Sequence, residues 1–186
     1  SFVHSYFEDG RWKSDVLLSF LADQAAEPKL TCSDEKGNLY CIYTKILRNQ
    51  AYCYLTQFDN KNSIWSKPAA LFQKPVKYSN FNGFVDSSGM MHMVWQEEAD
   101  GKFSLYYKKV DTEALNFSSA DVCIQEGNSS IQYPCISIGK GYHCRWVQNG
   151  KTMASHTDLS GNRWEPAQEI AGKPLQPYVH IYKTLD

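Results

Sequence analysis

The sequence lacks the features that mark several common classes of protein. Only four of its 186 residues are arginine, and its 19 basic side chains are balanced by 20 acidic ones. Because nucleic-acid binding calls for a clustered basic face, this near-neutral charge argues against such a partner. No apolar run approaches the roughly 20 residues of a membrane span, and Ser1–His4 does not begin a signal peptide. We therefore expect neither nucleic acid nor a membrane as a partner.

The six cysteines form no CxxC pair, so they indicate neither a metal site nor a small disulfide scaffold. Cys32 and Cys41 flank one predicted turn, and Cys135 and Cys144 flank another at the same spacing. We expect no disulfide at either turn, because a directly cross-strand bond strains the disulfide torsion. Six free thiols favour a cytoplasmic or other reducing compartment, although two Asn-x-Ser triplets point weakly the other way.

Catalytic and cofactor motifs are also missing. No Gly-rich phosphate loop occurs, and no serine or cysteine lies in a nucleophile motif. The five histidines suggest no metal site, because His92 and His143 align with Tyr40 in the repeat described below and so indicate a packing position. We expect no cofactor and no metal.

What the sequence does contain is a repeat of about fifty residues, detected in two independent registers. The first register is a set of aromatic anchors spaced 53, 52 and 47 residues apart: Trp12, Trp65, Phe117 and Trp164. The second is a set of aromatic residues spaced 52 and 51 apart: Tyr43, Trp95 and Trp146. Two registers with one period indicate a repeat architecture.

Each repeat unit is predicted to hold four short strands, named A to D here. In the unit at 30–72, strands A and B meet at the turn 34–37, and strands C and D meet at the turn 59–62. Glycine, aspartate and asparagine supply the positive φ angles that such turns need. A helix within 15–27 is the one alternative to strands that we retain.

Four-strand units that cannot bury both faces alone are typical of β-propeller blades. We predict an all-β, single-domain β-propeller of about four blades over 1–186. Three blades are complete, and a fourth is made from both chain ends. The predicted blade pieces are 1–18, 28–72, 78–124, 132–170 and 177–186. The chain would then be a compact four-blade ring, part of a larger ring, or one half of a ring completed by a second copy.

The turns between strands C and D carry a further pattern. Relative to an Asp-x-Gly-x-x-Trp spacing, segment 158–164 has one residue too many between its aspartate and its glycine, and segment 9–12 has one too few. The copies at Asp59 and Asp111 lack the glycine. With these residues the sequence resembles the sialidase-like propellers with Asp-box repeats, and the propeller lectins, over nearly the whole chain. The resemblance implies that each aspartate caps backbone donors in its turn while the aromatic anchor fills the gap between blades.

The same resemblance raises the question of glycoside hydrolysis. Sialidases bind a substrate carboxylate with three arginines. This chain has only four arginines, and two of them, Arg11 and Arg163, lie beside strand-D anchors. Other glycosidases need two carboxylates across a cleft, for which Glu97, Glu98 and Glu126 are the candidates. We keep a sialidase-like or other glycoside hydrolase as an alternative, and expect that the chain is not an enzyme.

The preferred hypothesis is a non-catalytic binding module for a glycan or a protein. Its surface would be the propeller face formed by the D–A and B–C loops, where aromatic rings lie beside amides that can bind hydroxyl groups. The predicted ligand-binding residues on this face are Tyr78, Asn80, Asn82, Trp95, Glu97, Trp146 and Tyr133. A third hypothesis is a purely structural set of blades that associates with itself or with further blades through unpaired strand edges.

Overall fold

The computed structural model describes residues 4–8, 11–15, 27–47, 50–73, 77–114, 117 and 119–171. Within these ranges the chain is all-β, as predicted, and each paired strand is antiparallel to its partner. No helix in the described ranges is long and apolar enough to cross a membrane. The alternative helix at 15–27 and the predicted closing strand at 177–182 fall almost entirely outside the described residues.

The strands form three larger sheets and one two-stranded ribbon, β1 (His4–Glu8) with β2 (Arg11–Asp15). The first sheet contains β3 (Glu27–Ser33), β4 (Leu39–Leu47), β5 (Gln50–Asp59), β6 (Ile64–Trp65) and β7 (Ala69–Gln73). The second contains β8 (Lys77–Val85), β9 (Met90–Ala99), β10 (Lys102–Asp111) and β11 (Val122–Gly127). The third contains β12 (Gln132–Ile138), β13 (Tyr142–Gln148), β14 (Lys151–Thr157) and β15 (Gln168–Glu169).

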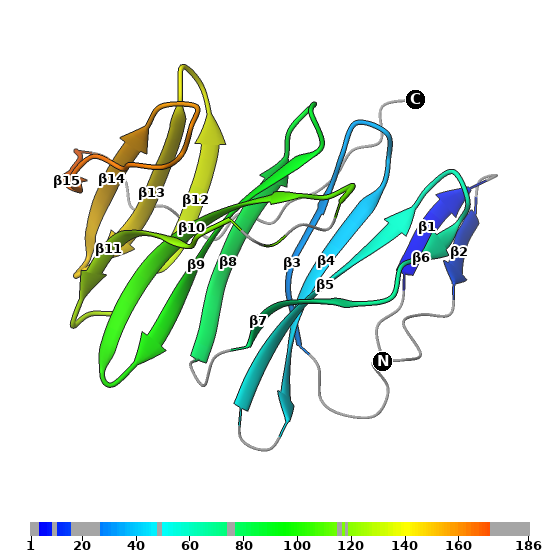
Figure 1. Cartoon of the computed structure of the whole chain (residues 1–186), viewed down its shortest axis with the longest axis horizontal. Coiled ribbons are helices and arrows are strands. Elements are labelled where there is room, and N and C mark those ends of the chain that lie inside the picture. The colour runs from blue at the N-terminus through cyan, green and yellow to red at the C-terminus, as the bar shows by residue number, and fades with distance from the viewer. Residues whose placement is uncertain are drawn as a thin grey trace.

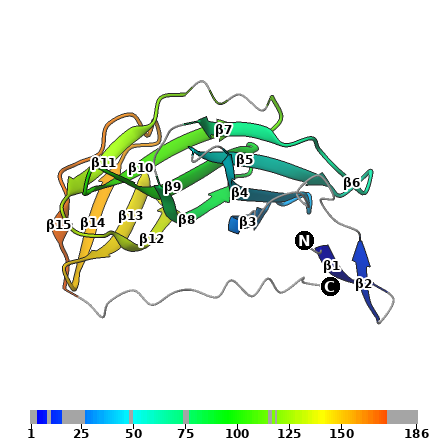
Figure 2. The same ribbon diagram turned by 90° about the horizontal axis from the view of Figure 1, so that it is seen from below.

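Each larger sheet is a meander whose strands pair in chain order, with β6 and β7 both pairing with β5 in the first sheet. The third, second and first sheets lie side by side in that order, with β1 and β2 at the far end (Figure 1). Strand β8 contacts β3 on one side and β12 on the other, so the first strands of successive sheets are neighbours. The described sheets form an open arc and not a closed ring (Figure 2).

Two-residue turns explain the tight connection of the second and third strands in two of the sheets. Asp100–Gly101 joins β9 to β10, and Asn149–Gly150 joins β13 to β14. All four residues have φ angles between 51° and 74°. Positive φ at both central positions defines the type I′ turn, whose twist matches that of the flanking strands and which favours Asp-Gly and Asn-Gly.

The turns between the third and fourth strands are capped as the resemblance implied. Asp158 Oδ1 accepts the Ser160 backbone N–H at 2.9 Å, and Asp111 Oδ1 accepts the Glu113 N–H at 3.0 Å. In these turns the aspartate carboxylates therefore accept hydrogen bonds from backbone N–H groups that have no strand partner. Trp164 packs edge-on against Tyr107 of the second sheet at 5.3 Å, so this anchor does fill the gap between two sheets.

The second sheet is buried on both faces. Every residue of β9 from Met91 to Glu97 is buried, because alternate side chains enter two different cores. Trp95 packs against the first sheet, with its ring 4.5 Å from that of Phe72. His92 faces the third sheet, with its ring 4.5 Å from that of Tyr142. This continuous run of buried residues is thus the pattern of a strand whose sheet has a neighbour on each side.

The third sheet is buried on one face only. In β13, Tyr142, Cys144 and Trp146 are buried against the second sheet, whereas His143 and Arg145 are exposed. This alternation over 142–146 is typical of a strand in a sheet with one solvated face. Among the described residues, the outer face of the third sheet therefore ends the stack.

The hairpin cysteines cannot form the two disulfides that their spacing allowed. Cys32 is opposite Tyr40, and Cys135 is opposite Arg145, so each cysteine is one residue out of register with Cys41 or Cys144. Adjacent residues of a strand point to opposite faces of the sheet, which places the two sulfurs of each hairpin on opposite sides. All six cysteines are free thiols.

This arrangement predicts a graded thiol reactivity. Exposed Cys123 should react first with a thiol reagent in the native protein. Burial raises the pKa of Cys32 to about 12 and that of Cys41 to about 11, so these thiols should react only after unfolding. Titration in denaturant without reductant is expected to count six thiols. A count of four or fewer would contradict the register described above.

Close packing at one capped turn gives a second prediction. Gly161 and Gly150 both have φ near 70°, but a Cβ on Gly161 would lie 2.7 Å from Tyr107 Cε1, whereas Gly150 has open space. We expect Gly150→Ala to cost about 1 kcal/mol through backbone strain, and Gly161→Ala about 1 kcal/mol more through overpacking. Urea unfolding of the two variants measures this difference in the free energy of unfolding. Equal decreases in the two variants would show that the Tyr107 ring can move aside without cost.

Candidate ligand-binding site

The three sheets share two ends that a ligand could approach. The loop end carries the connections Asp100–Gly101 and Asn149–Gly150 and the segment 127–132. The turn end carries the Asp-capped turns that begin at Asp34, Asp86, Asp111 and Asp158. The predicted ligand-binding residues belong to the loop end, so their surroundings are described first.

The predicted aromatic residues of the loop end are mostly packing residues in the structure. Tyr78 is 3% exposed, and Trp95 and Trp146 are fully buried. Tyr78 stacks on Phe72 at 5.4 Å, and Trp95 stacks on Tyr106 at 5.7 Å. A ligand could reach these ring faces only by separating the sheets. Tyr133 differs, because it is 43% exposed at a β-bulge with φ 51°.

The predicted amides hold the second sheet against the third. Asn80 Nδ2 donates to the carbonyl oxygen of Ile131 at 2.6 Å, and Asn82 Oδ1 accepts the N–H of Ile136 at 3.2 Å. Gln96, which the sequence analysis did not select, accepts the Ile131 N–H on its Oε1 and donates to Ser79. Side-chain amides therefore bond to backbone groups of β12 and of Ile131 just before it, along the edge of β12 that pairs with no described strand.

The three candidate acids all have partners at the loop end. Glu97 is 7% exposed and accepts the indole N–H of Trp95 at 3.1 Å. Glu98 pairs with Lys77 at 2.9 Å, and Glu126 pairs with Lys102 at 3.2 Å. Register pairing through Ser104 places Glu97 and Glu126 in one cross-strand row. The structure thus brings these two acids to one sheet without leaving a pair of carboxylates free of other partners.

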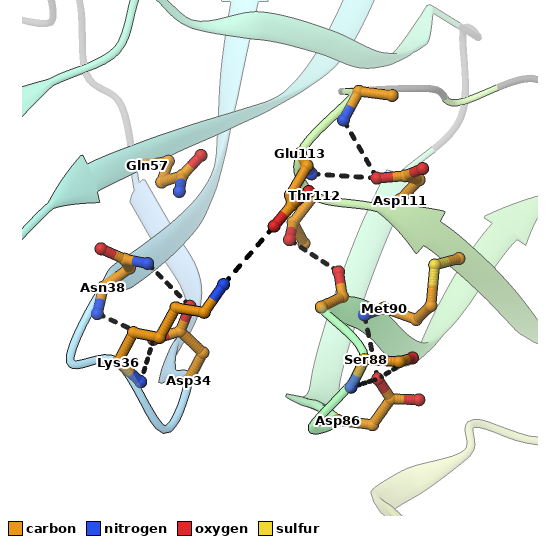
Figure 3. A network of polar contacts seen from close by, with 12 residues as sticks. Asp34, Lys36, Asn38, Gln57, Asp86, Ser88, Met90, Asp111, Thr112 and Glu113 are labelled. Carbon is orange, nitrogen blue, oxygen red and sulfur yellow. Dashed lines mark hydrogen bonds and ion pairs between the residues drawn. The ribbon is translucent and has the colours of Figure 1, made fainter.

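At the turn end, a polar network joins the first sheet to the second (Figure 3). Tyr40 O–H donates to Asp34 Oδ2 at 3.1 Å and lies 3.3 Å from the Thr112 hydroxyl. Thr112 in turn donates to the carbonyl oxygen of Gly89 at 2.7 Å. An exposed ion pair between Lys36 and Glu113, at 3.5 Å, crosses the same junction. These groups border a small cavity of about 110 Å³, which suits ordered water better than an organic ligand.

The equivalent position in the second sheet holds a buried hydrogen-bonded chain. His92 Nε2 lies 2.9 Å from Asp86 Oδ2, and His92 Nδ1 lies 2.9 Å from the Tyr107 hydroxyl. Burial lowers the pKa of His92 even though Asp86 opposes that shift, so the imidazole is neutral at pH 7. The neutral ring donates from Nε2 to Asp86 and accepts the Tyr107 proton on Nδ1.

Asp86 is the charged end of this chain. Burial by itself would raise its pKa, but hydrogen bonds from Ser88, His92 and the Met90 N–H outweigh burial and lower the pKa to about 2. The pairs Asp34–Tyr40 and Asp86–His92 both span six residues. The sequence shows this spacing, but the alignment of Tyr40 with His92 was interpreted only as a packing position. The aspartate six residues before each of them was the signal that could have revealed the hydrogen bond.

A further cavity lies between the second and third sheets at the turn end. Its volume is about 400 Å³, within the 300–1,000 Å³ range that is typical of small-molecule pockets. Its lining combines hydroxyl, amide and charged groups with apolar surface from Met90, Ala120 and Val122. The polar lining residues are Tyr107, Lys109, Asp111, Ser119, Ser160 and Asn162. Sequence reasoning missed this site, because its residues come from two sheets and from positions flanking the capped turns.

In the described ranges no group of three or more histidine, cysteine, aspartate or glutamate side chains is arranged to hold a metal ion. Neither a known protein family nor a curated protein sequence matches the chain. The candidate site therefore rests on its own geometry.

The buried His92 predicts how stability depends on pH. The native state binds fewer protons than the unfolded chain once pH falls below about 6.5, the ordinary histidine pKa, so the free energy of unfolding should decrease there by up to about 1.4 kcal/mol per pH unit. Below pH 3.8 Asp86 adds a second loss as it becomes protonated. Urea unfolding between pH 7 and 4.5 measures the first effect.

His92→Tyr places at this position the residue found at 40, which bonds to its own turn aspartate. The variant should fold and should lose most of the dependence of stability on pH between 6.5 and 4.5. His143→Tyr is the matched control, because His143 occupies the equivalent strand position but is exposed. An unchanged pH dependence in His92→Tyr would contradict a buried neutral imidazole.

Proposed function

We propose that the chain is a set of β-propeller blades that acts as a non-catalytic binding module, with a glycan as the favoured ligand and a protein as the other. The observation that carries the proposal is the cavity of about 400 Å³ at the turn end, between the second and third sheets, whose lining includes hydroxyl, amide and charged side chains. This proposal keeps the predicted class of function and moves the ligand from the loop end to the turn end.

The arrangement of the sheets supports the propeller part of the proposal. Each larger sheet is a meander in chain order, and the first strands β3, β8 and β12 are neighbours across the sheets. In a propeller, the first strand of each blade lines the central channel, and the blades pack face to face. The two buried cores on either side of the second sheet fit such packing.

The chemistry of the cavity favours a glycan over a protein. Sugars present hydroxyl groups, which amide, hydroxyl and charged side chains such as Asn162, Ser160 and Lys109 can bind. The large exposed apolar side chains among the described residues are spread over several elements: Ile64, Tyr133, Ile138 and Leu159. Scattered single residues do not form the broad apolar patch expected of a protein-binding surface.

Hydrolysis receives less support from the same geometry. The candidate acids Glu97, Glu98 and Glu126 are each bonded to a tryptophan or a lysine. A two-carboxylate mechanism needs one protonated and one ionised group facing each other across the substrate. A purely structural role would require a face that can pack against further blades. The outer face of the third sheet exposes the polar side chains of His143 and Arg145, so it gives that role no specific support.

A glycan array followed by calorimetric titration of a bound glycan tests the proposal. The double variant Lys109→Ala/Asn162→Ala removes two polar groups from the turn-end cavity. We expect it to weaken binding at least about tenfold, corresponding to 1.4 kcal/mol or more. The control is Asn80→Ala/Tyr133→Ala at the loop end, which should bind within about twofold of the wild type.

The two variants separate the two ends of the molecule. Loss of binding only in the loop-end variant would return the ligand to the face predicted from the sequence. An array without any bound glycan would contradict the favoured ligand class. Thermal unfolding of both variants is the required check, because Asn80 also bonds to Ile131.

A further inference from the structure

The outer face of the third sheet differs chemically from the equivalent faces of the other two sheets. The repeat aligns His143 with Tyr40 and His92, and Arg145 with Ile42 and Val94. In the first and second sheets these positions are buried, whereas in the third both side chains are exposed. A packing position has therefore been replaced by a cationic one.

This face carries a small basic cavity. Strand pairing sets His143 opposite His156 and Arg145 opposite Ala154, and pairs Ala154 with Gln168 in the next strand. The two imidazole rings stack with centroids 5.9 Å apart. His143, Arg145, His156 and Gln168 line a cavity of about 190 Å³ together with shorter side chains. That volume suits a single charged group rather than a whole drug-sized ligand.

The guanidinium of Arg145 has no acidic partner among the described residues. The ion pairs within these ranges join other residues, and the nearest described pair in the same sheet is Lys151 with Glu169 at 2.7 Å. Met153 is opposite Glu169, so Glu169 lies in the alternate row, which points to the other face of the sheet. Arg145 thus presents five N–H donors toward the cavity side without a bound carboxylate.

We propose that this cavity, named here the outer-face site, binds an oxyanion group, a carboxylate or a phosphate. The planar guanidinium fork matches two oxygens of either group. His143 and His156 each provide a ring N–H donor, and Gln168 provides an amide donor. The site lies on a different face from the turn-end cavity, so the two proposals are independent.

The alternative occupant of this face is a further sheet, as on the second sheet. The composition of the face argues against it, because a sheet laid over Arg145 would bury an unpaired cation, at a high desolvation cost. The second sheet presents Val94 at the equivalent position, where burial is favourable. Charge complementarity therefore favours a small anionic ligand.

Titration calorimetry and histidine-detected NMR with inorganic phosphate and with acetate, at ionic strength matched by sodium chloride, test the site. Saturable binding of one anion is expected, with shifts confined to the imidazole signals of His143 and His156. Arg145→Gln should weaken it at least about tenfold. Arg163→Gln removes the same charge from an exposed position outside the cavity and should leave binding unchanged within about twofold.

The preferred anion identifies the source of the oxyanion group, since phosphate and acetate are titrated separately. Equal weakening in Arg145→Gln and Arg163→Gln would overturn the proposal, because it would reveal only general attraction of anions. Absence of saturable binding would overturn it as well. Sedimentation of the whole chain covers the alternative: self-association that Arg145→Gln abolishes would make the face a protein interface and would end the proposal.

Discussion

The second sheet is buried on both faces, between the cores that it forms with the first and the third sheets. Strand β9 has no solvated face from Met91 to Glu97, so each of its side chains must fit one of two cores. The polar residues in that run are tolerated because each is bonded: His92 to Asp86 and Tyr107, and Gln96 to Ser79 and Ile131. Loss of one such bond would leave a buried polar group without a partner, which costs more than the bond itself contributes.

The two ends of the sheets use polar side chains differently. At the loop end, amides of the second sheet bind the backbone of β12, which fixes the spacing of two sheets but consumes the groups that a ligand would need. At the turn end, aspartates bind the backbone of their own turns, and a cavity of mixed polar and apolar lining lies between the second and third sheets. Capping within a turn is local, and the cavity beside these turns is lined by Lys109 and Asn162 as well as by the Ser119 and Ser160 hydroxyls, which donate within the protein.

The strands and their turns were predictable from sequence, because alternation, turn residues and a repeat all act locally. The predicted turn at 59–62 begins at the last residue of β5 (Gln50–Asp59), and the aspartate caps at 59, 111 and 158 are confirmed. The surroundings of the candidate site residues were not predictable, because they depend on which sheet faces which. Trp95 and Tyr133 are both aromatic residues at the loop end. Trp95 is buried between sheets, whereas Tyr133 lies at a β-bulge and is exposed to solvent. No local pattern separates these two outcomes.

The meander order of the sheets has a consequence for how the chain reaches this structure. Every strand in the larger sheets pairs with a strand close in sequence, so the first hairpins can form without closing a long loop of chain. The Asp100–Gly101 and Asn149–Gly150 turns hold two such hairpins in the geometry that the flanking strands require. Each sheet can thus assemble from its own segment, and the inter-sheet cores form when neighbouring sheets meet. We therefore expect folding to proceed sheet by sheet, with the second sheet, which contributes to two cores, stabilising both of its neighbours.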